Sequence, residues 1–197
     1  MCLLLFADAW LLGELEERTS LDTLREAGIP EESFQKAGIS KEESLLYIGF
    51  WKDLEYFPLA FPCEGEEKFF FENGWHDRRS FGGERFHEGC DIFGNRRLTD
   101  YYPVVSITDG QVEQKGWLPL GGWRIGVRSP GGGYFYYAHL SSYGRDFQEG
   151  DQVKAGELLG FLGDSGYGPE GTTGKFPPHL HLGIYVETEE DPEYALN

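Results

Sequence analysis

Hydrophobic and polar residues alternate with a period of two in residues 179–186. Residues two apart in a strand share a face, so one face of this segment would be apolar, made of Leu180, Leu182, Ile184 and Val186. The other face would carry His179 and His181, with their Cα atoms about 6.6 Å apart. The prolines at 177–178 argue against a helix that begins upstream. We therefore expect a strand with one face in the core and two imidazoles on the open face.

From residue 65 onward, short alternating runs are broken by glycines, which is typical of antiparallel strands joined by tight turns. Asp109-Gly110 is a turn signal between two apolar runs, and 129–133 connects the strand-like runs 123–128 and 133–140. Regular alternation would put Phe135, Tyr137 and His139 on one face. The predicted fold class is mainly β: an antiparallel β-sheet with a groove on one sheet face, walled by the loops around 93–103 and 163–176.

The first quarter of the chain has a different pattern, acidic and helix-prone. Helix caps and terminal glycines predict three short helices, near residues 20–28, 30–38 and 40–51. We expect a helical N-terminal lead segment over 1–55 and a catalytic domain over 56–197. The lead segment would be a packing layer, with a regulatory pro-segment as the weaker alternative. Residues 1–12 are apolar but shorter than a membrane span, and fit either a docking helix or a signal or anchor that is incomplete in this sequence.

Composition narrows the function classes. The chain has 197 residues, of which 28 are glycine, so one sizeable turn-rich domain is expected. A net charge of −17 disfavours nucleic acid and anionic membranes as partners. Cysteines at positions 2, 63 and 90 are too few and scattered for a disulfide framework. A Cys63–Cys90 bridge stays open, although small buried thiols are the favoured interpretation.

A second cluster of candidate ligands lies at residues 85–92. His87 and Asp91 would be about 13 Å apart in a fully extended strand, too far for one ion, but Gly89 could supply a bend. Two imidazoles, one carboxylate and water form a catalytic zinc shell with an open position, and this donor set favours zinc over calcium or magnesium. Cys90 is expected to point away from the metal, and Glu88 to be solvated or structural. His76 is expected to be a surface or structural histidine.

Six motifs, in this order and spacing, resemble those of one known family. They are His87-Glu-Gly-Cys-Asp91, Asp109-Gly-Gln-Val112, Tyr137-Ala-His-Leu140, Gly150-Asp-Gln-Val-Lys-Ala-Gly156, Gly160-Phe-Leu-Gly163 and His179-Leu-His181. From Trp75 to Tyr185 the chain is similar to the LytM/lysostaphin-type zinc metallopeptidases of family M23.

The resemblance implies that His87, Asp91 and His181 bind one zinc ion and that His139 and His179 are the catalytic pair. A family member would be an extracytoplasmic endopeptidase that hydrolyses peptidoglycan stem peptides or cross-bridges. A zinc-activated water, assisted by the two histidines, would be the nucleophile.

Several alternatives remain open. A non-catalytic family member that binds wall peptides or regulates a hydrolase would be expected to lack a ligand, and none is missing. A biotinyl or lipoyl carrier domain fits the turn at 150–159 but leaves five ordered site residues unexplained. Tyr137 either lines the cleft or packs beside it. Two interpretations are open for Arg85, Trp117 and Trp123. They border the cleft or, as the favoured interpretation, support it structurally.

Overall fold

The computed structural model describes residues 53–54, 58–59, 68–72, 74 and 76–185. These residues form strands and connecting loops without a helix, so none of them builds a helix long and apolar enough to cross a membrane. The three predicted helices and the domain boundary at residues 55 and 56 lie outside the described residues and stay predictions.

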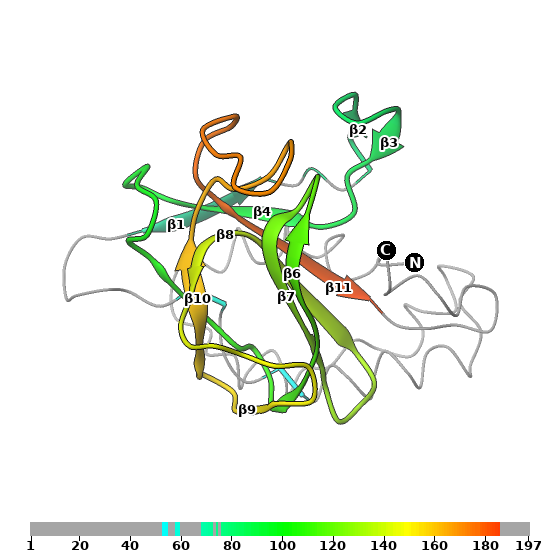
Figure 1. Ribbon diagram of the computed structural model, residues 1–197, viewed down its shortest axis with the longest axis vertical. Helices are drawn as coiled ribbons and strands as arrows, with labels where there is room; N and C mark the ends of the chain where they lie inside the picture. The colour runs from blue at the N-terminus through cyan, green and yellow to red at the C-terminus, as the bar shows by residue number, and fades with distance from the viewer. Residues whose placement is uncertain (1–52, 55–57, 60–67, 73, 75, 186–197) are drawn as a thin grey trace.

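The strands form one large antiparallel sheet and a separate hairpin (Figure 1). The strands are β1 (Phe69–Glu72), β2 (Arg78–Arg79), β3 (Arg85–Phe86), β4 (Cys90–Gly94), β5 (Pro103–Val105), β6 (Gly110–Leu118), β7 (Gly122–Arg128), β8 (Tyr134–Tyr143), β9 (Gln152–Val153), β10 (Leu158–Leu162) and β11 (Leu180–Tyr185). The main path runs β1-β4-β11-β8-β7-β6-β9, β10 joins β5 to β8, and β2 pairs only with β3. The predicted mainly antiparallel β fold is confirmed.

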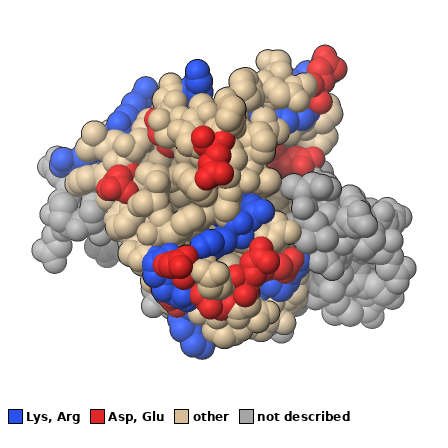
Figure 2. Space-filling model, in the orientation of Figure 1, with Lys and Arg blue, Asp and Glu red and all other residues tan. Residues whose placement is uncertain are grey.

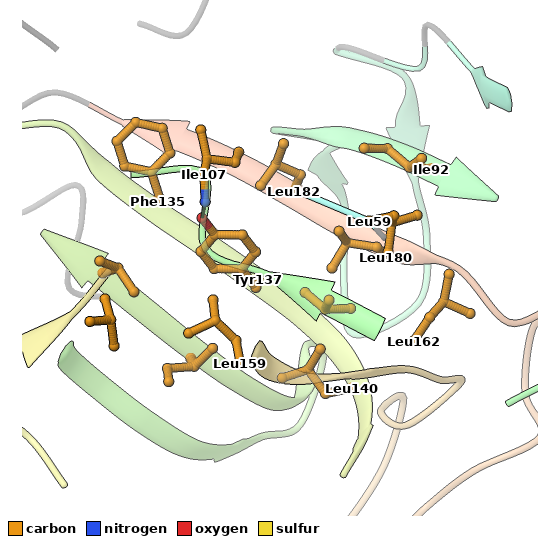
Figure 3. Packing of buried hydrophobic residues seen from close by; sticks show 14 of the residues in the cluster. Leu59, Ile92, Ile107, Phe135, Tyr137, Leu140, Leu159, Leu162, Leu180 and Leu182 are labelled. Carbon is orange, nitrogen blue, oxygen red and sulfur yellow. Dashed lines mark hydrogen bonds between the residues drawn. The ribbon is translucent and has the colours of Figure 1, made fainter. Parts of the chain in front are cut away.

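The apolar face of β11 lies in the core, as its alternation predicts. Leu180, Leu182 and Ile184 are all buried there. Tyr137 on β8 is fully buried beside leucines from other strands (Figure 3). Its hydroxyl accepts a hydrogen bond from the backbone N–H of Ile107 at 2.9 Å. Of the two alternatives for this tyrosine, the packed aromatic is therefore correct.

Strand β8 contains one extra residue, and this corrects the predicted face of His139. Along the β7–β8 pair, Ile125 is opposite Tyr137 but Trp123 is opposite Leu140, so three steps on β8 match two on β7. His139 has φ of 63°, in the left-handed region that breaks regular alternation. Because of this bulge, Tyr137 and Leu140 both lie in the core whereas His139 lines a groove.

The Asp109-Gly110 turn also differs from the expectation. The apolar runs on its two sides do not pair with each other, because β5 pairs with β10 and β6 pairs with β7 and β9. The Asp109 carboxylate instead accepts hydrogen bonds from the backbone N–H of Ala155 and the Nζ of Lys154. This aspartate therefore ties the start of β6 to the turn between β9 and β10.

Candidate active site

Strand register places Asp91 and His181 side by side. They are directly opposite each other in the β4–β11 pair, so their side chains leave the sheet on the same face. His87 follows β3, where its backbone N–H donates to Asp77 and its carbonyl accepts from the N–H of His76. Three side chains from separate segments thus meet at one point.

The three donor atoms form a nearly equilateral triangle. Asp91 Oδ1 lies 3.0 Å from both His87 Nε2 and His181 Nδ1, and the two nitrogens are 2.9 Å apart. Ligand atoms held at about 2.0–2.2 Å by a tetrahedral ion are about 3.3 Å apart, so the triangle is close to the size that such an ion requires. These three residues are the group of metal-ligating type found among the described residues.

The protonation of His87 supports the same interpretation. Its Nδ1 is 2.9 Å from the carbonyl oxygen of Gly74, and a carbonyl only accepts, so Nδ1 carries the proton. In the neutral ring, Nε2 then directs a lone pair at the Asp91 carboxylate. Two lone pairs 3.0 Å apart repel each other unless a proton or a metal ion lies between them, and the triangle of three such donor atoms fits a bound metal ion.

Asp91 is held as a carboxylate. Burial raises its pKa, but the imidazoles of His181 and His87 and the nearby His179 outweigh that effect, so the pKa lies well below the ordinary range. The second oxygen, Oδ2, is 3.5 Å from the guanidinium of Arg79 on β2. The carboxylate therefore offers one oxygen to the triangle and the other to an arginine.

Gly89 contributes through close approach. A Cβ at this position would lie 2.6 Å from Cε1 and Nε2 of His181 and 2.8 Å from the carbonyl oxygen of Leu182. Its φ is not among the positive values, so the chain passes from β3 to β4 without a left-handed residue here. The predicted approach of His87 to Asp91 occurs, and the missing side chain leaves room for the ring of His181.

His139 and His179 face the same groove as the triangle. The Nδ1 of His139 is 2.8 Å from the carbonyl oxygen of Ser165, and the Nδ1 of His179 is 2.8 Å from that of Pro177. Each carbonyl fixes the proton on Nδ1 and leaves Nε2 unprotonated. The ring centroids are 4.8 Å apart, and His179 Nε2 is 3.5 Å from Asp91 Oδ1.

Burial keeps both rings neutral. It is the main cause that lowers the pKa of His139, well below its ordinary value, and that of His179. Neighbouring histidines lower the pKa of His139 further, whereas Asp91 opposes the shift in both rings. Two neutral imidazoles, each with a free Nε2, can accept protons at neutral pH.

The groove around these residues has a volume of about 400 Å³. Phe93 and Arg97 come from the predicted wall at 93–103, and Tyr167 and Phe176 from the one at 163–176, so both predicted walls are confirmed. Arg85 also lines the groove, which corrects the expectation that it is only a support.

The β2–β3 hairpin forms a third wall that sequence reasoning missed. It contributes Arg79 together with Arg85. Strands of two residues are too short to show a period, and the Gly82-Gly83 pair was the only turn signal. Trp117 and Trp123 pack edge to face against each other at 5.4 Å and do not line the groove.

The remaining candidates behave as expected. Cys90 is a free thiol in the core, and burial raises its pKa to about 12. His76 is exposed and stacks on Phe86. Glu88 is half-buried and is not part of the ligand triangle.

Comparisons with known proteins agree with this geometry. Residues 85–192, more than half of the chain, match Peptidase family M23. The chain is 48% identical over 128 residues to the L-Ala–D-Glu endopeptidase of Bacillus subtilis (strain 168), covering 65% of this chain and 38% of that protein. It is 34% identical over 113 residues to lysostaphin of Staphylococcus simulans, covering 54% of this chain and 20% of that protein.

A similar solved structure is the crystal structure of a candidate glycyl-glycine endopeptidase lytM from Ruminococcus gnavus ATCC 29149. It has a TM-score of 0.69 and 47% sequence identity, covering 82% of this chain and 65% of that one. The chain spans less than two thirds of the length of each of these three relatives. Because the family matches over half of its residues and a similar solved structure shares its fold, the chain belongs to peptidase family M23.

Proposed function

We propose that this protein is a zinc-dependent endopeptidase that hydrolyses peptide bonds in peptidoglycan stem peptides or cross-bridges outside the cytoplasmic membrane. His87, Asp91 and His181 would hold one zinc ion, and His139 and His179 would be the catalytic pair. The observation that carries the proposal is the triangle of donor atoms, 2.9–3.0 Å on each side, beside two imidazoles with free Nε2 atoms in one groove. The endopeptidase names of the relatives support it.

The bound metal would polarise the scissile carbonyl and make a water nucleophilic near neutral pH. In the hydrolysis the C–N bond breaks, the water oxygen bonds to the acyl carbon, and the leaving nitrogen gains a proton. His139 and His179 have their Nε2 atoms available to accept the proton of the water. Once protonated, either ring can donate a hydrogen bond to the developing oxyanion and transfer its proton to the leaving amine.

The carrier-domain alternative is disfavoured by the surroundings of Lys154. Its Nζ is 2.7 Å from Asp109 Oδ2, and the strands on either side of its turn pair with different partners. A modifiable lysine would instead stand at the tip of a hairpin. The binding or regulatory alternative has no missing ligand to support it, since all five site residues are present.

The test is cleavage of purified peptidoglycan fragments by the full zinc-loaded chain, followed by mass spectrometry and metal analysis. We expect new amine and carboxyl termini, which disappear after chelation. His179→Ala should retain zinc but lose cleavage, whereas His87→Ala should lose both. His76→Ala is a matched control, because this exposed histidine does not line the groove, and it should keep both.

Two results would count against the proposal. Cleavage that survives in His179→Ala or after chelation would remove the assigned chemistry. A folded, zinc-containing protein that binds the fragments without cutting any would instead have a binding or regulatory role.

A further inference from the structure

Most of the charged side chains that line the groove are positive. Apart from Asp91 in the ligand triangle, the charged side chains that line it are Arg79, Arg85 and Arg97. With a divalent metal on the triangle, the groove would be strongly positive. A groove of this kind favours an anionic substrate.

This positive groove does not reflect a basic protein. Residues 76–185 contain 11 Lys and Arg against 13 Asp and Glu, whereas the whole chain has 17 against 34. On the face in Figure 2, acidic and basic side chains lie beside one another around β9. There Arg145 pairs with Asp151 and Glu157. Basic side chains in this cluster thus have carboxylates beside them, while the groove has three arginines and one carboxylate.

The three arginines differ in the hydrogen bonds and ion pairs that they make within the protein. Arg79 pairs with Asp91 and Asp77, and Arg85 donates to the Tyr167 hydroxyl and weakly to a backbone carbonyl. Arg97 is exposed, and the part of the chain that the structure describes gives it no hydrogen bond or ion pair. Arg97 is therefore the guanidinium most available to a ligand.

Arg97 and Arg85 both line the groove but come from segments that lie apart (Figure 1). Figure 1 shows the β2–β3 hairpin, which carries Arg85, and the loop after β4, which carries Arg97, on opposite sides of the molecule's upper edge. Phe93, four residues before Arg97 in the chain, stacks on His179 with ring centroids 5.1 Å apart. The segment that carries Arg97 thus also supplies an aromatic ring in contact with His179.

We propose that Arg97 is a specificity-determining residue that binds a free carboxylate of the peptide substrate, close to the cleaved bond. The inference rests on the proposed function. A guanidinium can donate two parallel hydrogen bonds to a carboxylate, and Arg97 lines the same groove as the ligand triangle. The preferred substrate is therefore an anionic peptide, and the amide of the same peptide binds less well.

The chain offers a matched control in the neighbouring arginine. Arg96 is also exposed, but its guanidinium lies over the ring of Tyr101 at 5.5 Å and it does not line the groove. Arg97→Gln and Arg96→Gln remove the same charge from adjacent positions. Only the first removes it from the groove.

The experiment compares two peptidoglycan stem peptides, one with its glutamate carboxylate free and one with that group as a carboxamide. The value of kcat/KM is measured for the full zinc-loaded chain and for both variants. We expect the wild-type chain to prefer the carboxylate form by about 10- to 100-fold, the range for a charge-assisted contact. Arg97→Gln should reduce the preference to about threefold or less by lowering only the value for the carboxylate form, and Arg96→Gln should preserve it.

Equal cleavage of both peptides by the wild-type chain would overturn the inference while leaving the proposed function intact. An equal loss on both peptides in Arg97→Gln would overturn it as well, because that pattern indicates a structural role. Cleavage of neither peptide would count against the proposed function, and calorimetric binding then decides the inference separately. Tighter binding of the carboxylate form that depends on Arg97 would support it, and equal binding would overturn it.

Discussion

Tyr136 and Tyr137 are adjacent tyrosines on opposite faces of β8, which makes them a sensitive test of the bulged strand. Tyr137 is fully buried and its hydroxyl accepts from the Ile107 N–H, whereas Tyr136 lines the groove and has no hydrogen-bond partner among the described residues. Burial raises the pKa of Tyr137 above its ordinary value, so the hydroxyl stays neutral. Replacing each tyrosine by phenylalanine removes the same atom from two different environments.

Tyr137→Phe leaves the buried Ile107 N–H without its acceptor. The expected cost is about 1–3 kcal/mol in the free energy of unfolding. For a chain of this size, each kcal/mol corresponds to about 2–4 °C in Tm. Tyr136→Phe breaks no hydrogen bond within the described structure and should change the free energy of unfolding by less than about 0.5 kcal/mol.

Urea unfolding followed by tryptophan fluorescence measures both variants, and peptide cleavage is measured beside it. Tyr137→Phe should lower the unfolding midpoint and leave kcat/KM within about twofold, because its side chain does not line the groove. If Tyr137→Phe kept wild-type stability but lost cleavage, the hydroxyl would act in the groove, and the assignment of Tyr137 to the core face of β8 would be wrong.

Three further results are expected. Gly89→Ala should weaken zinc binding at least tenfold, measured by calorimetry, because the added Cβ would overlap the His181 ring. The far-UV circular dichroism spectrum should stay unchanged. An unchanged zinc affinity would show that the ring can move aside. Hydrogen bonds from Lys154 and Ala155 lower the pKa of Asp109 in the folded state. The Asp109 carboxylate therefore stabilises the fold at pH values above about 3.9, its pKa in the unfolded chain. This stabilisation is lost as the pH falls through the lower pKa of the folded state. The stability difference between wild type and Asp109→Asn should therefore shrink below about pH 4 in urea titrations, and a constant difference would contradict this. Chelation should lower the Tm. If zinc had been present at 1,000 times its Kd, the free energy of unfolding should fall by about 4 kcal/mol, and an unchanged Tm would argue against a bound ion.

The sequence predicts the fold class and the face of β11 well because both depend on local alternation. Leu180, Leu182 and Ile184 are buried where a period of two puts them. The same rule fails at His139, because a bulge depends on pairing with β7 and not on the local pattern. The Asp109-Gly110 signal fails for a related reason, since the strands on its two sides pair with distant partners.

For the site, residue identity was more informative than geometry. The five predicted residues lie around one groove, although their roles as ligands and catalytic groups stay predictions. Arg79 and Arg97 could not be found from the sequence, because the strand of Arg79 is too short to show a hydrophobic period and Arg97 lies in a loop. Their importance depends on which side chains surround them, and only the folded chain shows that.

The left-handed backbone at His139 implies a conflict between stability and activity in this strand. An L residue in that conformation costs about 1–2 kcal/mol relative to the extended one, and glycine avoids most of the cost. As far as this backbone cost is concerned, selection for heat resistance would replace the histidine with glycine. Only selection for the imidazole itself would retain it, so a screen of random variants for thermal tolerance should enrich inactive proteins at this position.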